Sequence, residues 1–168
     1  MADFSFTTQT GEPLSRDELL GKVWIANFVF TSCAAECLVL SSRIAELQMH
    51  LKRYDDVAFV SFSVDPQTDT PKRLGEYADR WHADSGRWHF LTGDPAKMDG
   101  IVLDSFLLPV TRDPAELEKL GSTNLIHSNR LAVVDRTGKV RAYVDGLPSE
   151  SVAAVIQMVM QLRKEPAL

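Results

Sequence analysis

Cysteine is scarce in this sequence: of its 168 residues only Cys33 and Cys37 are cysteines. So few cysteines exclude a small scaffold held together by disulfides, and their close spacing points to local chemistry between them. Long apolar runs are also missing, since no stretch approaches the roughly 18 residues needed to cross a bilayer. Runs of lysine and arginine are missing too, and the net charge is −5, so a nucleic-acid-binding surface is not expected.

The remaining composition is that of an ordinary soluble globular protein. Apolar residues make up 45% of the chain and charged residues 24%. The length suits one domain, so we expect residues 1–168 to form a single domain. No signal peptide is recognisable after Met1, which leaves either a natural start or a start from which a leader or anchor was removed.

Near-continuous apolar runs rich in β-formers predict buried strands. A hairpin-like segment is expected first, at residues 4–13. The strands that follow are expected at 23–30, 57–64, 88–91, 131–134 and 140–144. The last two flank the turn sequence DRTG at 135–138, which indicates a β-hairpin.

Capping signals place helices between these strands. Ser15 to Glu18 is a capping-box sequence that opens one helical turn, closed by Gly21. Thr70 is expected as the N-cap of a helix to about Trp81, and residues 92–95 should turn into another helix. The helix after Cys33 should end near Arg53 and bury Val39, Ile44, Leu47 and Leu51. A last helix should be capped by Ser149 or Ser151 and bury Val152, Val155, Ile156, Val159 and Leu162. The polar stretch 107–124 is expected to be a loop.

This order of elements predicts an α/β fold. Strands that alternate with helices imply parallel pairing through right-handed crossovers, and the terminal hairpin adds antiparallel strands. The fold class expected by analogy is a thioredoxin-like three-layer fold with a mixed central sheet, an N-terminal extension and an inserted strand-helix segment. Analogy at this level does not establish a function.

Cys33 and Cys37 are expected where the strand at 23–30 gives way to a helix, at the end of the sheet where ligands bind in α/β proteins. Partial positive charge at a helix start favours the thiolate. A thioredoxin redox motif has two residues between its cysteines, whereas here there are three. Residues four apart in a helix have Cα atoms roughly 6 Å apart, near the upper end of what a disulfide accepts, so a disulfide is feasible with local unwinding of the helix. A shared metal ion does not require that closure. Two inert buried thiols are the alternative.

His127 is the candidate third ligand, because a thioredoxin-like topology returns residues 124–128 beside the start of the first long helix. A surface or core histidine without a role is the alternative, and we assign no role to His50, His82 and His89. Two thiolates and one imidazole suit three-coordinate Cu(I), can hold Cu(II) with an added ligand, and can also bind zinc.

Several stretches together resemble the Sco/SenC family over nearly the whole chain. They are FVFTSC at 28–33 with Cys37 after it, SVDPQTDTP at 63–71, LTG at 91–93, and IHS at 126–128 followed by VDRTG at 134–138. The resemblance implies a copper-binding metallochaperone that assists assembly of the copper centre of cytochrome c oxidase, with thiol–disulfide activity in some members. It implies one copper ion per chain, as Cu(I) or Cu(II), held by Cys33, Cys37 and His127.

The resemblance also implies a setting for the protein. Its partners would be the copper-bearing oxidase subunit or another copper protein, and a thiol reductant. It would face the periplasm or another extracytoplasmic space, anchored by an N-terminal helix that this chain does not include. Asp65 matches an acidic family residue and is a candidate for supporting the ligands, although a turn residue beside Pro66 is an equal alternative.

One departure from the family pattern concerns the cysteine loop. Family members usually have proline after each cysteine, and this chain has Ala34 and Leu38 there. Proline restricts the backbone, so the loop shape and the reduction potential are expected to differ. Two other activities remain open. One is a thiol–disulfide oxidoreductase that uses Cys33 and Cys37. The other is a peroxidase, which the position of Thr31 disfavours because a peroxidase motif needs threonine three residues before the cysteine.

Overall fold

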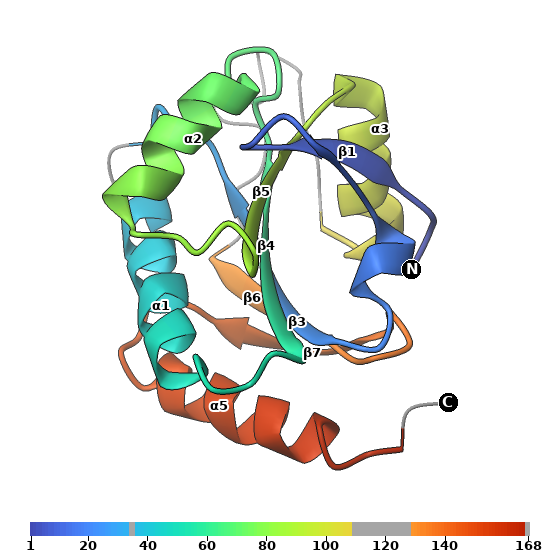
Figure 1. Cartoon of the computed structure of the whole chain (residues 1–168), viewed down its shortest axis with the longest axis vertical. Coiled ribbons are helices and arrows are strands. Elements are labelled where there is room, and N and C mark those ends of the chain that lie inside the picture. The colour runs from blue at the N-terminus through green and yellow to red at the C-terminus, as the bar shows by residue number, and fades with distance from the viewer. Residues whose placement is uncertain (34–35, 109–128, 167–168) are drawn as a thin grey trace.

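The computed structural model describes residues 1–33, 36–108 and 129–166. These residues form a mixed seven-stranded sheet with the strand order β2-β1-β5-β4-β3-β6-β7 (Figure 1). The strands are β1 (Ser5–Thr8), β2 (Pro13–Ser15), β3 (Val23–Val29), β4 (Val57–Ser63), β5 (Trp88–Thr92), β6 (Arg130–Val134) and β7 (Val140–Asp145). The helical elements are η1 (Arg16–Leu19), α1 (Glu36–His50), α2 (Pro71–Arg80), α3 (Pro95–Gly100), η2 (Ile101–Ser105) and α5 (Ser151–Leu162).

The centre of the sheet is parallel and its two flanks are antiparallel. β3 pairs with β4 and β4 with β5 in parallel, as expected for strands joined through α1 and α2. β1 lies antiparallel to β5 on one side, and β6 lies antiparallel to β3 on the other. The mixed sheet predicted from the sequence is therefore confirmed, and β3, the strand that leads to the cysteines, lies inside it.

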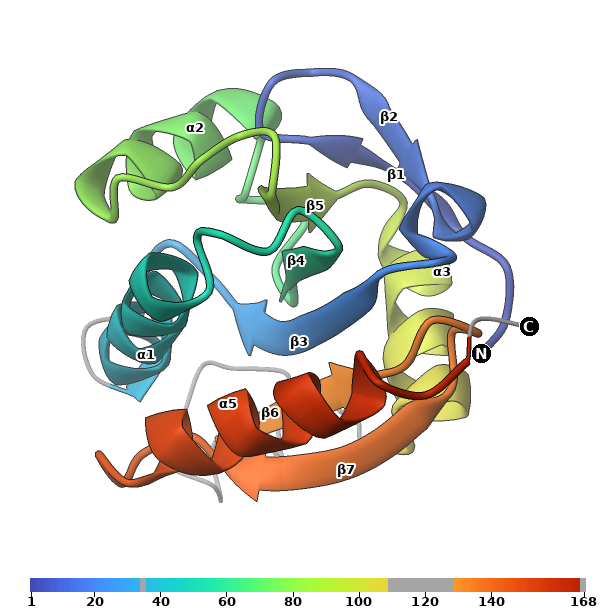
Figure 2. The same ribbon diagram turned by 60° about the horizontal axis from the view of Figure 1, so that its bottom comes forward.

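Helices cover both faces of the sheet, which gives three layers. α1, α2 and α5 lie on one face, and α3 with η2 lies on the other (Figures 1 and 2). β3 shows why both faces are apolar: Ile25 belongs to the cluster under α1, α2 and α5, whereas its neighbour Trp24 belongs to the cluster on the α3 side. Successive side chains of a strand point to opposite faces, so a strand covered on both sides is apolar throughout.

Most of the capping signals are confirmed. The carboxylate of Glu18 accepts a hydrogen bond from the Ser15 N–H at 2.7 Å, and the turn ends at Gly21 with φ +83°. Thr70 caps α2 by accepting from the N–H of Arg73, and Asp94 caps α3. Glu18, Thr70 and Asp94 each have a side-chain oxygen close to an N–H group at a helix start, where such groups lack a partner within the helix.

Two details of the helices differ from the prediction. Val39 was expected in the core but is 37% exposed, and Leu40 is buried in its place. The reason is the phase of α1, whose buried positions are Cys37, Leu40, Ser41, Ile44 and Leu47. α5 is not capped by Ser149 or Ser151; its N-cap residue is Glu150, with no capping side-chain hydrogen bond, and the Ser151 hydroxyl donates to the carbonyl of Pro148 instead.

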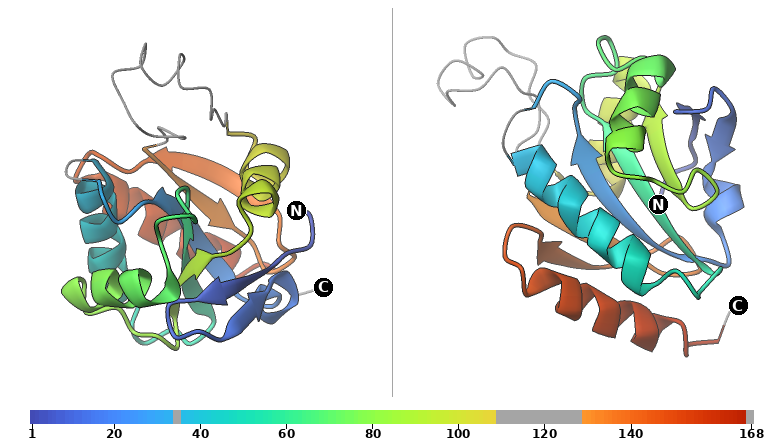
Figure 3. Two further views of the ribbon diagram at one scale, coloured as in Figure 1. Left: turned by 90° about the horizontal axis from the view of Figure 1, so that it is seen from above. Right: turned by 60° about the vertical axis from the view of Figure 1, so that its left-hand side comes forward.

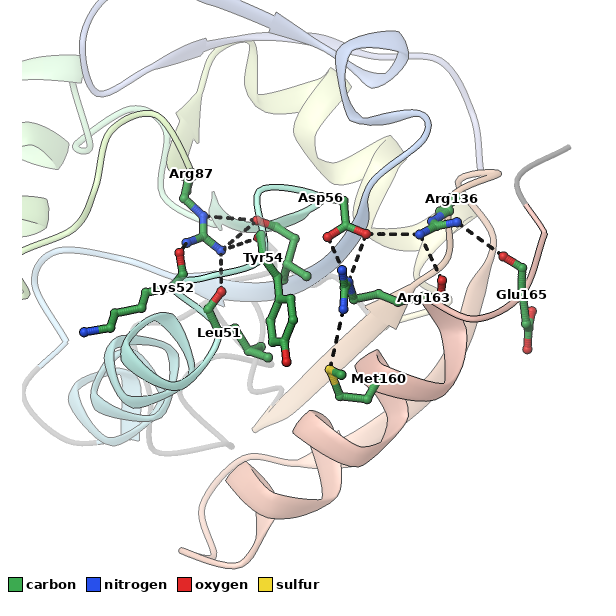
Figure 4. Close-up of polar contacts among 10 residues, drawn as sticks. Leu51, Lys52, Tyr54, Asp56, Arg87, Arg136, Met160, Arg163 and Glu165 are labelled. Carbon is green, nitrogen blue, oxygen red and sulfur yellow. Dashed lines mark hydrogen bonds and ion pairs between the residues drawn. The ribbon is translucent and has the colours of Figure 1, made fainter.

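Polar contacts surround the N-terminal ends of the parallel strands β4 and β5, at the end of the sheet opposite the cysteines (Figure 4). Asp56, just before β4, accepts hydrogen bonds from Arg163 at 2.8 Å and from Arg136 at 3.0 Å. Arg87, just before β5, donates to the carbonyls of Leu51, Lys52, Tyr54 and Val57. These contacts fix the C-terminal ends of α1 and α5 against the sheet.

The predicted loop at 107–124 falls almost entirely outside the described residues. Figure 3 shows the described elements from two further directions, with α1 and α5 side by side in the right-hand view. In the described part of the chain no helix combines the length and apolar character required to cross a membrane.

Candidate metal centre

The two cysteines lie at the C-terminal end of β3. After Val29 and the buried Phe30, the chain turns, and the N–H of Cys33 donates to the carbonyl of Phe30 at 3.1 Å. α1 begins at Glu36, so Cys33 precedes the helix and Cys37 lies in its first turn. The carboxyl ends of parallel strands are the usual place for a ligand site in α/β sheets, which agrees with the predicted position.

The two sulfurs differ in their surroundings. Cys37 is buried and Cys33 is half-buried, and both are free thiols. Burial and then a hydrogen bond with the Cys33 side chain raise the pKa of the Cys37 thiol well above its usual range, against a smaller opposing effect of the Phe30 backbone. Cys37 is therefore the inner thiol, and Cys33 is the sulfur that an approaching partner contacts first.

The side chain of Tyr77, on α2, reaches the first turn of α1. Its hydroxyl shares a 2.9 Å hydrogen bond with the Ser41 hydroxyl and donates to the carbonyl of Cys37 at 3.5 Å. Tyr77 is 2% exposed and Ser41 is fully buried, so the contact is shielded from water. The turn that carries Cys37 is thus held by a neighbouring helix.

Asp69 is a residue of this site that the sequence analysis did not single out. Its carboxylate is fully buried and accepts hydrogen bonds from the Thr31 N–H and hydroxyl and from the Ser63 hydroxyl. A usable signal was present: an acidic residue between a buried strand and a Thr-Pro helix start, at the same sheet end as the cysteines. Only its neighbour Asp65 in the same segment was named.

Asp65 begins the turn after β4. Its carbonyl accepts from the N–H groups of Thr68 and Asp69, and its own N–H donates to the Ser63 hydroxyl. These backbone contacts are those of a turn residue. A role of its carboxylate in supporting metal ligands stays a prediction.

His127 lies outside the described residues, so its expected place beside α1 stays a prediction as well. Within the described ranges no group of three or more His, Cys, Asp or Glu side chains could hold a metal ion. His50 and His82 are exposed, and His89 is half-buried on β5. What the structure brings together is therefore a pair of thiols, which can bind a soft metal ion or be oxidised to a disulfide.

Comparisons with known proteins identify the family of this chain. Residues 1–161 match the family model described as SCO1/SenC. A SCO1 protein homolog of Bacillus subtilis (strain 168) is 32% identical over 158 residues, which cover 93% of this chain and 79% of that protein.

Solved structures give the same result. A SCO1/SenC family lipoprotein from Bacillus anthracis str. Ames is 31% identical with a TM-score of 0.86, covering 98% of this chain and 95% of that one. BsSco, described as having a disulfide switch and as a member of the Sco family of cytochrome c oxidase assembly proteins, is 30% identical with a TM-score of 0.83, covering 98% and 94%.

A more distant structure shares the fold. Bradyrhizobium japonicum ScoI, solved with copper bound, is 23% identical with a TM-score of 0.72, covering 93% of this chain and 97% of that one. The family match over residues 1–161, the relatives of 30% identity or more and the thioredoxin-like fold lead to one conclusion. This chain belongs to the SCO1/SenC family.

Proposed function

We propose that this chain is a copper-binding metallochaperone that assists assembly of the copper centre of cytochrome c oxidase. Cys33, Cys37 and His127 are its proposed ligands, for one copper ion per chain. The observation that carries the proposal is the contact between the Cys33 and Cys37 side chains at the carboxyl end of β3, in a chain of the SCO1/SenC family. BsSco is named among oxidase assembly proteins, and ScoI was solved with copper, which supports the same role here.

The chemistry of the donors fits the cargo. Two adjacent thiols are soft ligands of the kind that Cu(I) prefers, and one imidazole completes a three-coordinate set. Copper is cargo here, taken up by the reduced thiols and passed to a client protein. The half-buried Cys33 is the ligand that a client's own thiols can reach and replace. Oxidation of the pair to a disulfide removes both sulfur ligands, so uptake depends on a thiol reductant.

The name of one relative supports the proposed location. That relative is named a lipoprotein. We place the domain on the periplasmic or other extracytoplasmic face of a membrane, anchored to it through a segment before the domain. The client proposed is the copper-bearing subunit of cytochrome c oxidase or another copper protein.

Copper titration of the reduced protein tests the ligand set. Anaerobic titration with Cu(I) against a chromogenic chelator should give one tightly bound ion per chain. Cys33→Ser and Cys37→Ser should abolish tight binding, and His127→Ala should weaken it sharply. His50→Ala is the matched control, because His50 is exposed at the far end of α1. Absence of uptake by the reduced parent protein would disprove the copper role.

Delivery requires a separate measurement. The loaded protein is mixed with the copper-free soluble domain of an oxidase copper subunit, and the absorption of the assembled copper centre is followed. Transfer should occur with the loaded parent protein, and the copper-free parent protein should give no assembled centre. If the client stays copper-free while the parent protein keeps its copper, the assembly role is wrong although copper binding stands.

A second candidate function is supported by the same contact between thiols. A thiol–disulfide oxidoreductase would use Cys33 to attack a partner's disulfide and Cys37 to release the partner, with both electrons passing to it. The disulfide switch named for BsSco favours this alternative. A Cys37→Ser variant should then trap a mixed disulfide through Cys33, and activity should survive His127→Ala. Failure of Cys37→Ser to trap any partner, with Cys33 still reactive to alkylation, would count against it.

A further inference from the structure

Asp69 is a buried carboxylate held entirely by hydroxyl and amide donors. It accepts from the Thr31 N–H at 3.1 Å and 3.2 Å, one distance to each oxygen, and from the Thr31 hydroxyl at 2.6 Å. The Ser63 hydroxyl donates to its Oδ2 at 2.7 Å. Asp69 is 0% exposed, and a buried carboxylate is stable only when such donors replace water. Its position is therefore strongly fixed.

These bonds join three segments at the carboxyl end of the sheet. Thr31 follows β3, Ser63 is the last residue of β4, and Asp69 directly precedes the Thr70 N-cap of α2. Because Thr31 donates through both its backbone and its side chain, the loop after β3 cannot rotate without breaking charge-assisted hydrogen bonds.

The hydrogen bonds between Asp69 and Thr31 lie close in the chain to the sulfur of Cys33. Thr31 is two residues before Cys33, and the turn between them is closed by the bond from the Cys33 N–H to the Phe30 carbonyl. On the other side of the pair, the Tyr77 hydroxyl donates a hydrogen bond to the carbonyl of Cys37. The segment from Asp69 to Tyr77 thus contacts the chain on both sides of the cysteine pair.

We propose that Asp69 is a positioning residue: through Thr31 it holds the Cys33 sulfur beside the Cys37 sulfur and so stabilises the disulfide that the pair can form. The inference builds on the proposed use of this pair, but it concerns closure of the disulfide and not copper. Fixing two groups near each other raises their effective concentration without any new contact between them. Release of the loop should therefore make the disulfide easier to reduce.

The test uses equilibration of the full chain, free of metal, with oxidised and reduced dithiothreitol. Closure forms the Cys33–Cys37 bond and breaks the disulfide of the reagent, which takes up two electrons and two protons. Asp69→Asn keeps the shape but can no longer accept all these bonds. It should lower the equilibrium constant for closure about tenfold, which is about 30 mV for this two-electron couple.

Two substitutions at Thr31 separate positioning from general damage. Thr31→Val keeps the shape but loses the hydroxyl bond, and it should lower the closure constant about threefold. Thr31→Ser keeps the hydroxyl and should stay within about twofold of the parent protein. This pair decides the question even if Asp69→Asn does not fold.

Val159→Ala is the control for lost stability, because Val159 is buried on α5, away from the cysteines. It should lower the stability to urea and leave the closure constant unchanged. If Asp69→Asn and Thr31→Val shift the closure constant no more than Val159→Ala does, the proposal is wrong. The result is independent of copper: a chain that binds no copper can still show the shift, and a chain that binds copper can lack it.

Discussion

Removal of the Tyr77 hydroxyl would break the contact between α2 and the turn of α1 that carries Cys37. In Tyr77→Phe the ring keeps its place against Phe90, 5.8 Å away between ring centroids. The hydroxyl of Ser41, which is 0% exposed, loses its 2.9 Å partner. A buried hydroxyl without a partner costs about 1 to 3 kcal/mol, and a serine in a helix can recover part of this by bonding to the carbonyl four residues earlier. We therefore expect a loss of about 1.5 kcal/mol.

The reverse substitution completes a double-mutant cycle. Ser41→Ala takes the same bond away from Tyr77 and should cost about 1 kcal/mol, because the tyrosine keeps the Cys37 carbonyl as an acceptor. The double variant removes both hydroxyls and leaves neither unsatisfied. Its loss should be about 1.5 kcal/mol, well below the sum of the two single losses, which gives a coupling energy of about 1 kcal/mol.

Urea unfolding of the reduced, metal-free protein, followed by far-ultraviolet circular dichroism, measures all four proteins of the cycle. A loss of 1.5 kcal/mol shifts the midpoint by roughly 0.7 M if the slope is about 2 kcal/mol per M. The slope should be the same in all four. Strict additivity, with the double variant losing the sum of the single losses, would refute the reasoning, since it would mean that the two hydroxyls do not interact.

Three further predictions concern stability, each measured by urea or thermal unfolding. Gly146→Ala should cost about 1 to 3 kcal/mol, because its Cβ would lie 2.4 Å from a methyl carbon of the buried Leu40; a neutral result would mean that the core there is loose. Burial raises the pKa of Asp56, but hydrogen bonds from two arginines outweigh it and place the pKa below the ordinary 3.8, so this ion pair stabilises the fold above that pH and is lost below it. Asp56→Asn should therefore lose less stability than the parent between about pH 5 and pH 3, and equal losses would contradict this. Burial lowers the pKa of His89 below the ordinary 6.5, so on acidification the unfolded chain takes up this proton before the folded chain does. The parent protein should therefore lose stability between about pH 7 and pH 5, and His89→Gln should lose less over that range. Equal losses in the two proteins would disprove this role.

Much of the fold could be predicted because local signals were strong. The runs at 23–30 and 57–64 are apolar at nearly every position, and the structure buries β3 and β4 throughout. Thr70 precedes a proline and caps α2 as expected, and the turn predicted at 92–95 does lead into a helix, α3. These features depend on a few neighbouring residues, so the sequence alone carries the information.

Features that depend on tertiary contacts were less accessible. Val39 and Leu40 are equally suited to a core, and only the packing of α1 on the sheet decides between them. The attachment of β1 to β5 joins segments far apart in the chain, with Thr7 opposite Thr92. Asp69 was overlooked because a carboxylate in a turn is usually solvated, and its burial becomes visible only when β3 and β4 are placed side by side.

The candidate site was located by its cysteines, whose position after a buried strand was predicted correctly. The places of Cys33 just before the helix and of Cys37 in its first turn were also expected, but the contact between their side chains could not be predicted. Because only Cys37 is part of the helix, the helical repeat does not fix the distance between the two sulfurs. Their contact is set by the neighbouring turn and by Asp69 and Tyr77, none of which a spacing rule includes.

The apolar cluster on the α3 side of the sheet has a practical consequence. Cys37 is part of this cluster, Cys33 packs against it, and Trp24 is the only one of the three tryptophans within it. Trp81 and Trp88 belong to the cluster on the other face. A label-free optical signal follows from this division. A change in the chemical state of the two sulfurs should alter the fluorescence of Trp24, and Trp24→Phe should remove that change while keeping the emission of the other two tryptophans.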